Sequence, residues 1–66
     1  MKLPRATFIR ICWKVGTVDY FTPQAWADLV KADPGAAAEA VSITRQRKAY
    51  RIDNGFRVPV SYTARN

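Results

Sequence analysis

The sequence from residue 45 to residue 58, RQRKAYRIDNGFRV, decides the expected fold of this chain. Three of its first four residues are basic, and a short β-hairpin is indicated around Asn54–Gly55, a dipeptide typical of hairpin turns. This order predicts a basic helix end followed by a hairpin over 49–61. A helix followed by a basic hairpin is typical of a small DNA-binding domain with a wing.

The length of the turn determines which residues share a face of this hairpin. A two-residue loop would mix apolar and charged side chains on both faces. A three-residue loop, with Gly55 in the left-handed region, would make one face apolar by pairing Ile52 with Phe56. It would also place Arg51 opposite Arg57 on the other face. Like charges directly opposite each other are destabilising, so this register predicts that a polyanion neutralises them; an ordinary solubilising face is the alternative.

Length and composition exclude several classes of protein. A chain of 66 residues is expected to form one domain, 1–66, with a marginal core. The single cysteine, Cys12, rules out an internal disulfide, and without histidine neither zinc nor another metal is expected. We also expect no cofactor and no small-molecule substrate. No apolar run reaches the length of about 20 residues that spans a membrane, so a cytoplasmic protein without a membrane partner is expected.

Basic residues concentrate at the two ends of the chain. The net charge is +6: residues 1–14 carry four bases and no acid, residues 15–44 one base against four acids, and residues 45–66 six bases against one acid. This distribution predicts a directed electrostatic surface for an anionic partner. An enzyme is not expected, because there is no histidine, the only cysteine lies on an expected strand, and the five acids are scattered.

The first half of the chain predicts a β-hairpin followed by a helix. Apolar residues alternate through 7–15, which predicts a strand, and the next residues predict a short return strand ending near Tyr20. Thr22 followed by proline is a helix start, so a helix is expected over 23–32. The aromatic residues on either side of this start, Phe21 and Trp26, are expected to pack together as a hydrophobic staple, with Trp26 as a core residue.

A second helix is expected directly after the first. Asp33 followed by Pro34 repeats the pattern of a cap residue and a proline at the first helical position. The alanine-rich segment that follows predicts a helix over 34–47. Only a tight turn can separate the two helices, so they must cross steeply. The expected fold class is therefore α+β: a small winged helix-turn-helix domain with two helices, a C-terminal hairpin wing, and an extra N-terminal strand or hairpin.

One short motif resembles a known family. Residues 20–26, YFTPQAW, are similar to the opening of the lambda-type phage excisionases, in which an aromatic-x-Thr-x-Gln-x-Trp segment starts the first helix. The distance from Thr22 to the Asn54–Gly55 turn is also similar to that family's. The resemblance covers residues 20–61 and implies a recombination directionality factor of a phage or prophage. Such a protein is non-catalytic, binds and bends attachment-site DNA, and directs an integrase toward excision.

The resemblance also implies partners and a binding surface. Double-stranded DNA would receive the second helix in its major groove and the wing along its minor groove or phosphates. A phage integrase, and further copies of the chain bound cooperatively along DNA, are the other implied partners. Few polar residues occupy the first two turns of the expected second helix, which implies readout of phosphates and DNA shape more than of base edges. The candidate DNA-binding residues are Thr44, Arg45, Gln46, Arg47, Lys48, Arg51 and Arg57.

Besides the few polar residues early in the expected second helix, the sequence departs from the family in a second way. Two other functions are alternatives. Nineteen residues precede the motif, where the family usually begins near its first helix. A small phage-encoded interaction module, or an inhibitor of an acidic host protein, would use the same basic face. RNA binding through a sheet would need exposed aromatic side chains beside basic residues, whereas most of Phe8, Tyr20 and Tyr50 are expected to face the core. A steep salt dependence would distinguish DNA binding from a protein interface.

Overall fold

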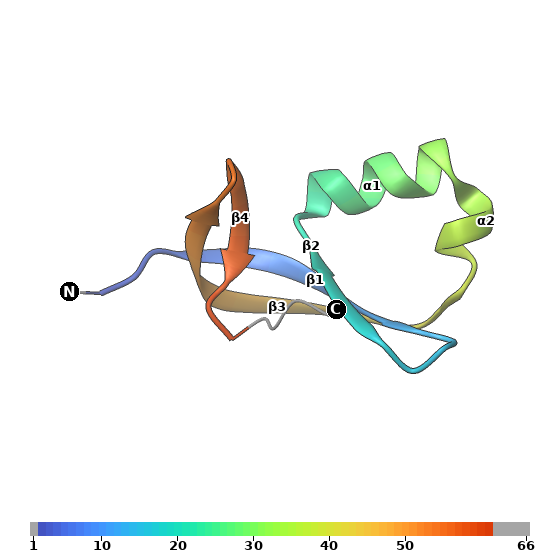
Figure 1. Cartoon of the computed structure of the whole chain (residues 1–66), viewed down its shortest axis with the longest axis horizontal. Coiled ribbons are helices and arrows are strands. Elements are labelled where there is room, and N and C mark those ends of the chain that lie inside the picture. Colours follow the sequence, from blue (N-terminus) through green and yellow to red (C-terminus); the bar gives the residue numbers. More distant parts are fainter. Residues whose placement is uncertain (1, 62–66) are drawn as a thin grey trace.

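The computed structural model of this protein is a four-stranded antiparallel sheet with two short helices between the second and third strands (Figure 1). The residues that the structure describes are 2–61. The strand order is β2-β1-β3-β4, so β1 and β3 are the central strands. The elements are β1 (Arg5–Trp13), β2 (Val18–Phe21), α1 (Pro23–Ala32), α2 (Pro34–Ala37), β3 (Ala40–Asp53) and β4 (Phe56–Pro59).

The first hairpin confirms the strand and the return strand expected from the alternation. Residues 9–12 of β1 pair with residues 18–21 of β2, and residues 5–13 pair on the other side with β3. β1 also supplies most of the core, because its buried hydrophobic residues are Ala6, Phe8, Ile9 and Ile11. Buried residues therefore lie on both faces of this strand, Ile9 and Ile11 on one and Ala6 and Phe8 on the other.

The start of α1 confirms the expected cap. Thr22 has extended backbone angles, and its hydroxyl oxygen accepts a hydrogen bond of 3.2 Å from the amide of Ala25. Such a cap contributes about 0.5–2 kcal/mol to stability. The Phe21 and Trp26 rings, whose centroids are 5.5 Å apart, form the expected staple, and Trp13 of β1 lies 6.3 Å from Trp26. These three aromatic residues fix α1 on one face of the first hairpin.

The second helix is much shorter than expected, and the winged helix-turn-helix prediction is wrong. Asp33 does cap α2 through its carboxylate, which accepts from the amide of Ala36 at 3.1 Å. The helix nevertheless ends at Ala37, and residues 40–53 form the longest strand of the sheet. Strands dominate this α+β fold, and the basic segment at 45–48, expected at the end of a recognition helix, lies within β3.

The reason for this difference lies in the pairing of β3 with β1. Residues 40–49 align antiparallel with residues 5–13, with one irregularity beside Val41 between Cys12 and Trp13. Alanine, arginine, glutamine and lysine favour helices in isolation, but that preference amounts to tenths of a kcal/mol per residue. The β-branched residues Val41, Ile43 and Thr44 fit a pleated sheet, and a paired strand satisfies the otherwise open edge of β1. Tertiary pairing therefore overrides helix propensity.

The hairpin of β3 and β4 is confirmed, but its expected register is wrong. Ile52 lies opposite Arg57, Arg51 opposite Val58, and the loop has only two residues. Both loop residues have positive φ, 51° at Asn54 and 83° at Gly55, as a type I′ turn requires. Gly55 thus adopts the expected left-handed conformation. Turn chemistry sets the register here because the tip of this hairpin is not packed into the core: Ile52 is 63% exposed.

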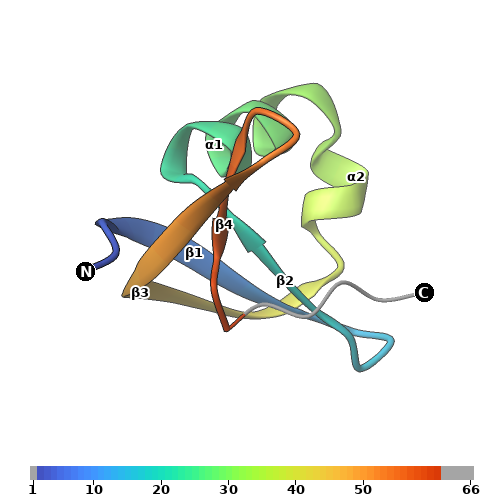
Figure 2. The ribbon, with the colours of Figure 1, turned by 60° about the vertical axis from the view of Figure 1, so that its left-hand side comes forward.

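The second half of β3 turns away from the first half and forms an arm with β4. Figures 1 and 2 show this arm standing out of the line of the other strands, on the side of α1. Its base is anchored in the core, because the Tyr50 ring lies edge-on to Phe8 at 6.5 Å between centroids, and Pro59 is fully buried. Pro59 belongs to an edge strand, where its missing amide hydrogen is tolerated.

Candidate nucleic-acid interface

Register and alternation assign the side chains of β1 and β3 to two faces. The face that carries Ile9 and Ile11 is here named the helix face, because Trp13 on this face packs against α1. The opposite face is named the Phe8 face. Residues directly opposite each other on neighbouring strands share a face, so the pairing of Ile9 with Arg45 places that arginine on the helix face.

The candidate residues divide between these two faces and do not form a single patch. On the helix face are Arg45, Arg47 and Arg51. On the Phe8 face are Thr44, Gln46, Lys48 and Arg57. Each group follows from the two-residue period of a strand, whereas a helical period would have gathered Arg45 and Lys48.

The helix face of β3 carries an exposed row of arginines. Arg45, Arg47 and Arg51 are all exposed, because α1 covers this face over β1 and β2 only. Arg5 of β1 joins the row: it lies opposite Ala49, and its guanidinium donates a hydrogen bond of 3.1 Å to the backbone oxygen of Arg47. Side chains two residues apart on a strand are about 6.6 Å apart. Arg5, Arg45, Arg47 and Arg51 are named the arginine stripe.

The charge of the arginine stripe is not neutralised by any carboxylate within residues 2–61. Within residues 2–61, none of the four guanidinium groups forms a salt bridge with a carboxylate. Asp53, at the far end of β3, is an exposed acid on the same face of the strand. Four mutually repelling cations on one exposed surface are energetically favourable only in contact with an anionic partner or with salt ions.

The Phe8 face holds its polar residues in a more enclosed setting. Gln46 and Lys48 are half-buried, and the side-chain oxygen of Gln46 is buried without a hydrogen-bond partner among the described residues. Arg10, opposite Thr44, donates to the Sγ atom of Cys12 at 3.0 Å. This face therefore presents fewer free donors than the arginine stripe, although its exposed Thr44 remains accessible.

Arg57 is held by an aromatic ring, and the expected repulsion between Arg51 and Arg57 is not present. The two arginines lie on opposite faces of the hairpin. The guanidinium carbon of Arg57 sits 5.3 Å from the centroid of the Tyr50 ring, a cation–π contact. If the two arginines faced each other, Arg57→Thr would preserve or raise stability by removing the repulsion. The contact of Arg57 with Tyr50 gives the opposite expectation.

Arg57→Thr is now expected to lower the free energy of unfolding by about 0.5 kcal/mol. A cation–π contact at an exposed site contributes about 0.5–1 kcal/mol, and the strand preference of threonine recovers part of that loss. Urea denaturation of the two proteins measures the difference. Arg51→Thr removes the same charge from the opposite face and is expected to leave stability nearly unchanged. A more stable Arg57→Thr protein would contradict the cation–π explanation.

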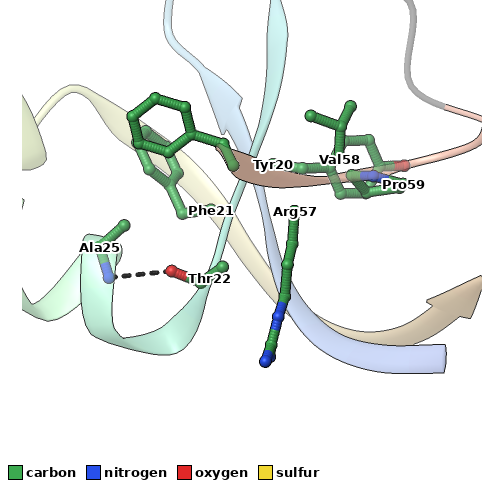
Figure 3. A pocket seen from close by; sticks show the side chains of 8 residues that line it. Tyr20, Phe21, Thr22, Ala25, Arg57, Val58 and Pro59 are labelled. Carbon is green, nitrogen blue, oxygen red and sulfur yellow. Dashed lines mark hydrogen bonds between the residues drawn. The ribbon is translucent and has the colours of Figure 1, made fainter. Parts of the chain in front are cut away.

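A cavity of about 330 Å³ lies where the arm approaches α1 (Figure 3). Tyr20, Phe21 and the capping residue Thr22 line one side, and residues 56–59 of β4 line the other. Figure 3 shows the Thr22–Ala25 hydrogen bond and, beside Thr22 in this view, the side chain of Arg57. The helix start is already capped and the lining is mainly apolar, so this cavity adds no second group of free polar side chains to the stripe.

Sequence reasoning missed Arg5 as a member of the site. Arg5 lies outside the strand predicted over 7–15, and Arg47 was predicted at the end of a helix, so no argument placed the two residues near each other. Reading residues 40–48 with a period of two would have supplied the missing signal. Among residues 2–61, no three His, Cys, Asp or Glu side chains come together as a possible metal site. No helix in the same residues is long and apolar enough to span a membrane.

Comparison of the chain with protein-family models, with curated protein sequences and with solved structures gave no significant match. The resemblance to the excisionases therefore stands on residues 20–26 alone. Their local structure is the expected helix start, with Thr22 as the cap. The remainder of the layout that suggested the family, a long second helix before the wing, is replaced by strand β3.

Proposed function

We propose that this protein is a non-catalytic DNA-binding protein that contacts the phosphate backbone of double-stranded DNA through the arginine stripe. The observation that supports this most directly is the row of exposed guanidinium groups at 45, 47 and 51, which have no carboxylate partner within residues 2–61. Arginine is well suited to phosphate, because its planar fork donates two parallel hydrogen bonds to two oxygens. Arg5 adds a fourth guanidinium beside Arg47.

The binding element in this proposal is a strand surface, where the sequence had indicated a helix. A slender two-stranded ribbon is narrow enough to enter the major groove, which is about 12 Å wide. The stripe runs along β3 into the arm, and the arm projects from the rest of the molecule (Figure 1). The regular row of like side chains suits phosphate contacts, which set position and affinity more than base sequence.

The finer assignment, an excisionase that bends attachment-site DNA and directs an integrase, is proposed on the segment 20–26 only. That segment caps α1 and lies on a different part of the fold from the arginine stripe. An integrase partner would therefore have to be tested independently of DNA binding. A pull-down with a purified phage integrase as the probe would test it directly.

A protein-binding module is the second candidate, and one observation favours it. Two β-branched apolar side chains on β3, Val41 and Ile43, are 66% and 58% exposed. Exposed apolar residues on a strand are typical of sites that contact other proteins. The two candidates differ in their response to salt, because only DNA releases a condensed layer of counterions when it is bound.

The experiment that tests DNA binding is a fluorescence anisotropy titration of a short random-sequence duplex at several salt concentrations. If three or four phosphates are contacted, the slope of log K against log salt is expected to be about −3 to −4. Binding should differ little between duplex sequences, because phosphate contacts carry no sequence information. Absence of binding at low salt, or a slope near zero, would contradict the proposed function and favour a protein partner.

A further inference from the structure

The outward-facing edge of β3 is open over much of its length. The direction of its backbone groups follows from two hydrogen bonds: the amide of Tyr50 donates to Pro4 on the β1 side, and the amide of Val60 donates to the oxygen of Ala49 on the opposite side. In an antiparallel strand these directions alternate residue by residue. Odd-numbered residues from 43 to 53 therefore point their amide and carbonyl groups away from β1.

β4 forms hydrogen bonds with the backbone groups of only the second half of this edge. It pairs with residues 50–53, and the bond from Val60 to Ala49 extends that pairing by one residue. The carbonyl oxygen of Arg47 accepts a hydrogen bond from the guanidinium of Arg5. Among the described residues, the amide and carbonyl of Ile43 and Arg45, and the amide of Arg47, have no ladder partner. A row of unpaired backbone groups is a template for another strand.

The side chains along this open edge are unevenly distributed. Arginine and lysine at 45, 47 and 48 occupy its C-terminal half, and charge of this kind normally protects an edge from unwanted pairing. The N-terminal half has no such protection, because Val41 and Ile43 are exposed there and the nearest charge is the acid Glu39. Ile43 stands between the apolar and acidic half and the basic half.

We propose that two copies of this protein associate through these edges, as antiparallel strands related by a twofold axis at Ile43. An antiparallel copy reverses the order of the charges, so each basic half meets the apolar and acidic half of the other copy. Ile43 would pair with Ile43 of the partner subunit and exchange two backbone hydrogen bonds with it. Val41 would lie opposite Arg45 of the partner subunit, and Glu39, which precedes β3, would lie beyond that pair.

This arrangement satisfies the open backbone groups without opposing like charges. Direct cross-strand pairs of like charge are destabilising, and pairs of opposite charge contribute about 0.2–1 kcal/mol. The twofold axis at Ile43 pairs Ile43 with itself, Ser42 with Thr44 and Val41 with Arg45, so no two like charges face each other, and the partner occupies the same patch in both copies. The resulting contact is small, so a reversible, concentration-dependent dimer is expected. The inference does not depend on DNA binding and is tested in its absence.

The first test compares two isoleucines of similar exposure by sedimentation equilibrium at moderate salt. Ile43→Asp places two carboxylates opposite each other on the twofold axis and is expected to weaken the dimer by about tenfold or more. Ile52→Asp makes the same change at the tip of the arm, where the side chain is 63% exposed, and is expected to leave the dimer unchanged. Equal weakening by both variants, or a wild-type protein that remains monomeric at millimolar concentration, would overturn the proposal.

A second test reads the edge directly through amide hydrogen exchange. The amides of Ile43 and Arg45 should exchange rapidly in dilute protein and become protected as concentration rises, whereas the inward amide of Thr44 should be protected throughout. Ile43→Pro removes the outward amide without breaking a bond to β1 and should abolish the concentration dependence. Val41→Glu should strengthen the dimer, because it places a carboxylate opposite Arg45 of the partner subunit. Amides at 43 and 45 that are protected at every concentration would show an edge already filled within one copy and would overturn the proposal.

Discussion

Replacing Arg45 and Arg47 together with alanine is expected to weaken binding to duplex DNA by about 10- to 100-fold and to reduce the salt slope by about 2. Both side chains are exposed and point from the helix face of β3, so their removal deletes two charges and leaves the core intact. The loss should be nearly the same for every duplex sequence, because a phosphate contact carries no base information. Anisotropy titrations of wild type and variant, at two salt concentrations, measure both quantities.

The matched control removes two exposed positive charges outside the arginine stripe, by replacing Lys14 and Lys31 with alanine. Lys14 follows β1 and Lys31 lies in the last turn of α1, so neither belongs to the arginine stripe. This control lowers the net charge by the same amount and should change affinity only slightly. If the control variant loses as much affinity as the stripe variant, net charge rather than the stripe would account for binding.

The sequence predicted those parts of the fold that depend on neighbouring residues. The cap residues Thr22 and Asp33 bond to the amides expected of them, and α1 covers residues 23–32 as predicted. The strand at the N-terminus and the Asn54–Gly55 turn were also visible, because alternation and turn chemistry are local properties. Each of these features can be recognised within a window of about ten residues.

The features that depend on distant residues could not be predicted in the same way. The segment 40–48 has residues that suit a helix and residues that suit a strand, and its state depends on its partners in β1, which lie 27 to 42 positions earlier. The hairpin register was argued from a clean division between an apolar and a basic face, which matters only if one face is buried. Phe56 is 72% exposed, so burial of an apolar face does not stabilise the predicted register.

The structure therefore brings together only part of the predicted site. The sequence identified the residues Arg45, Arg47 and Arg51, but assigned them to two elements, a helix end and a wing. In the structure they share one face of a single strand, together with Arg5 from the other end of the chain. The charged residues can be identified from the sequence, whereas the face on which they lie together depends on the strand pairing.

Phe8→Ala is expected to have the largest effect on stability of any single substitution in this chain. Phe8 is fully buried and its ring lies edge-on to Tyr50, at the base of the arm. Truncating a buried phenylalanine to alanine costs about 3–5 kcal/mol, from lost transfer free energy and the cavity left behind. Small domains have only about 5 kcal/mol at the low end of the usual range. The variant is therefore expected to be largely unfolded at room temperature, which circular dichroism and urea denaturation would show.

Phe56→Ala is the control for this substitution, because it removes the same group from an exposed position on β4. Its effect should stay within about 0.5 kcal/mol. The comparison also tests the fold, because Phe8 shares its face of β1 with the polar residues Arg10 and Cys12. The Tyr50 ring at the base of the arm packs against Phe8 on this face. A Phe8→Ala protein as stable as Phe56→Ala would contradict the packing of the arm on β1.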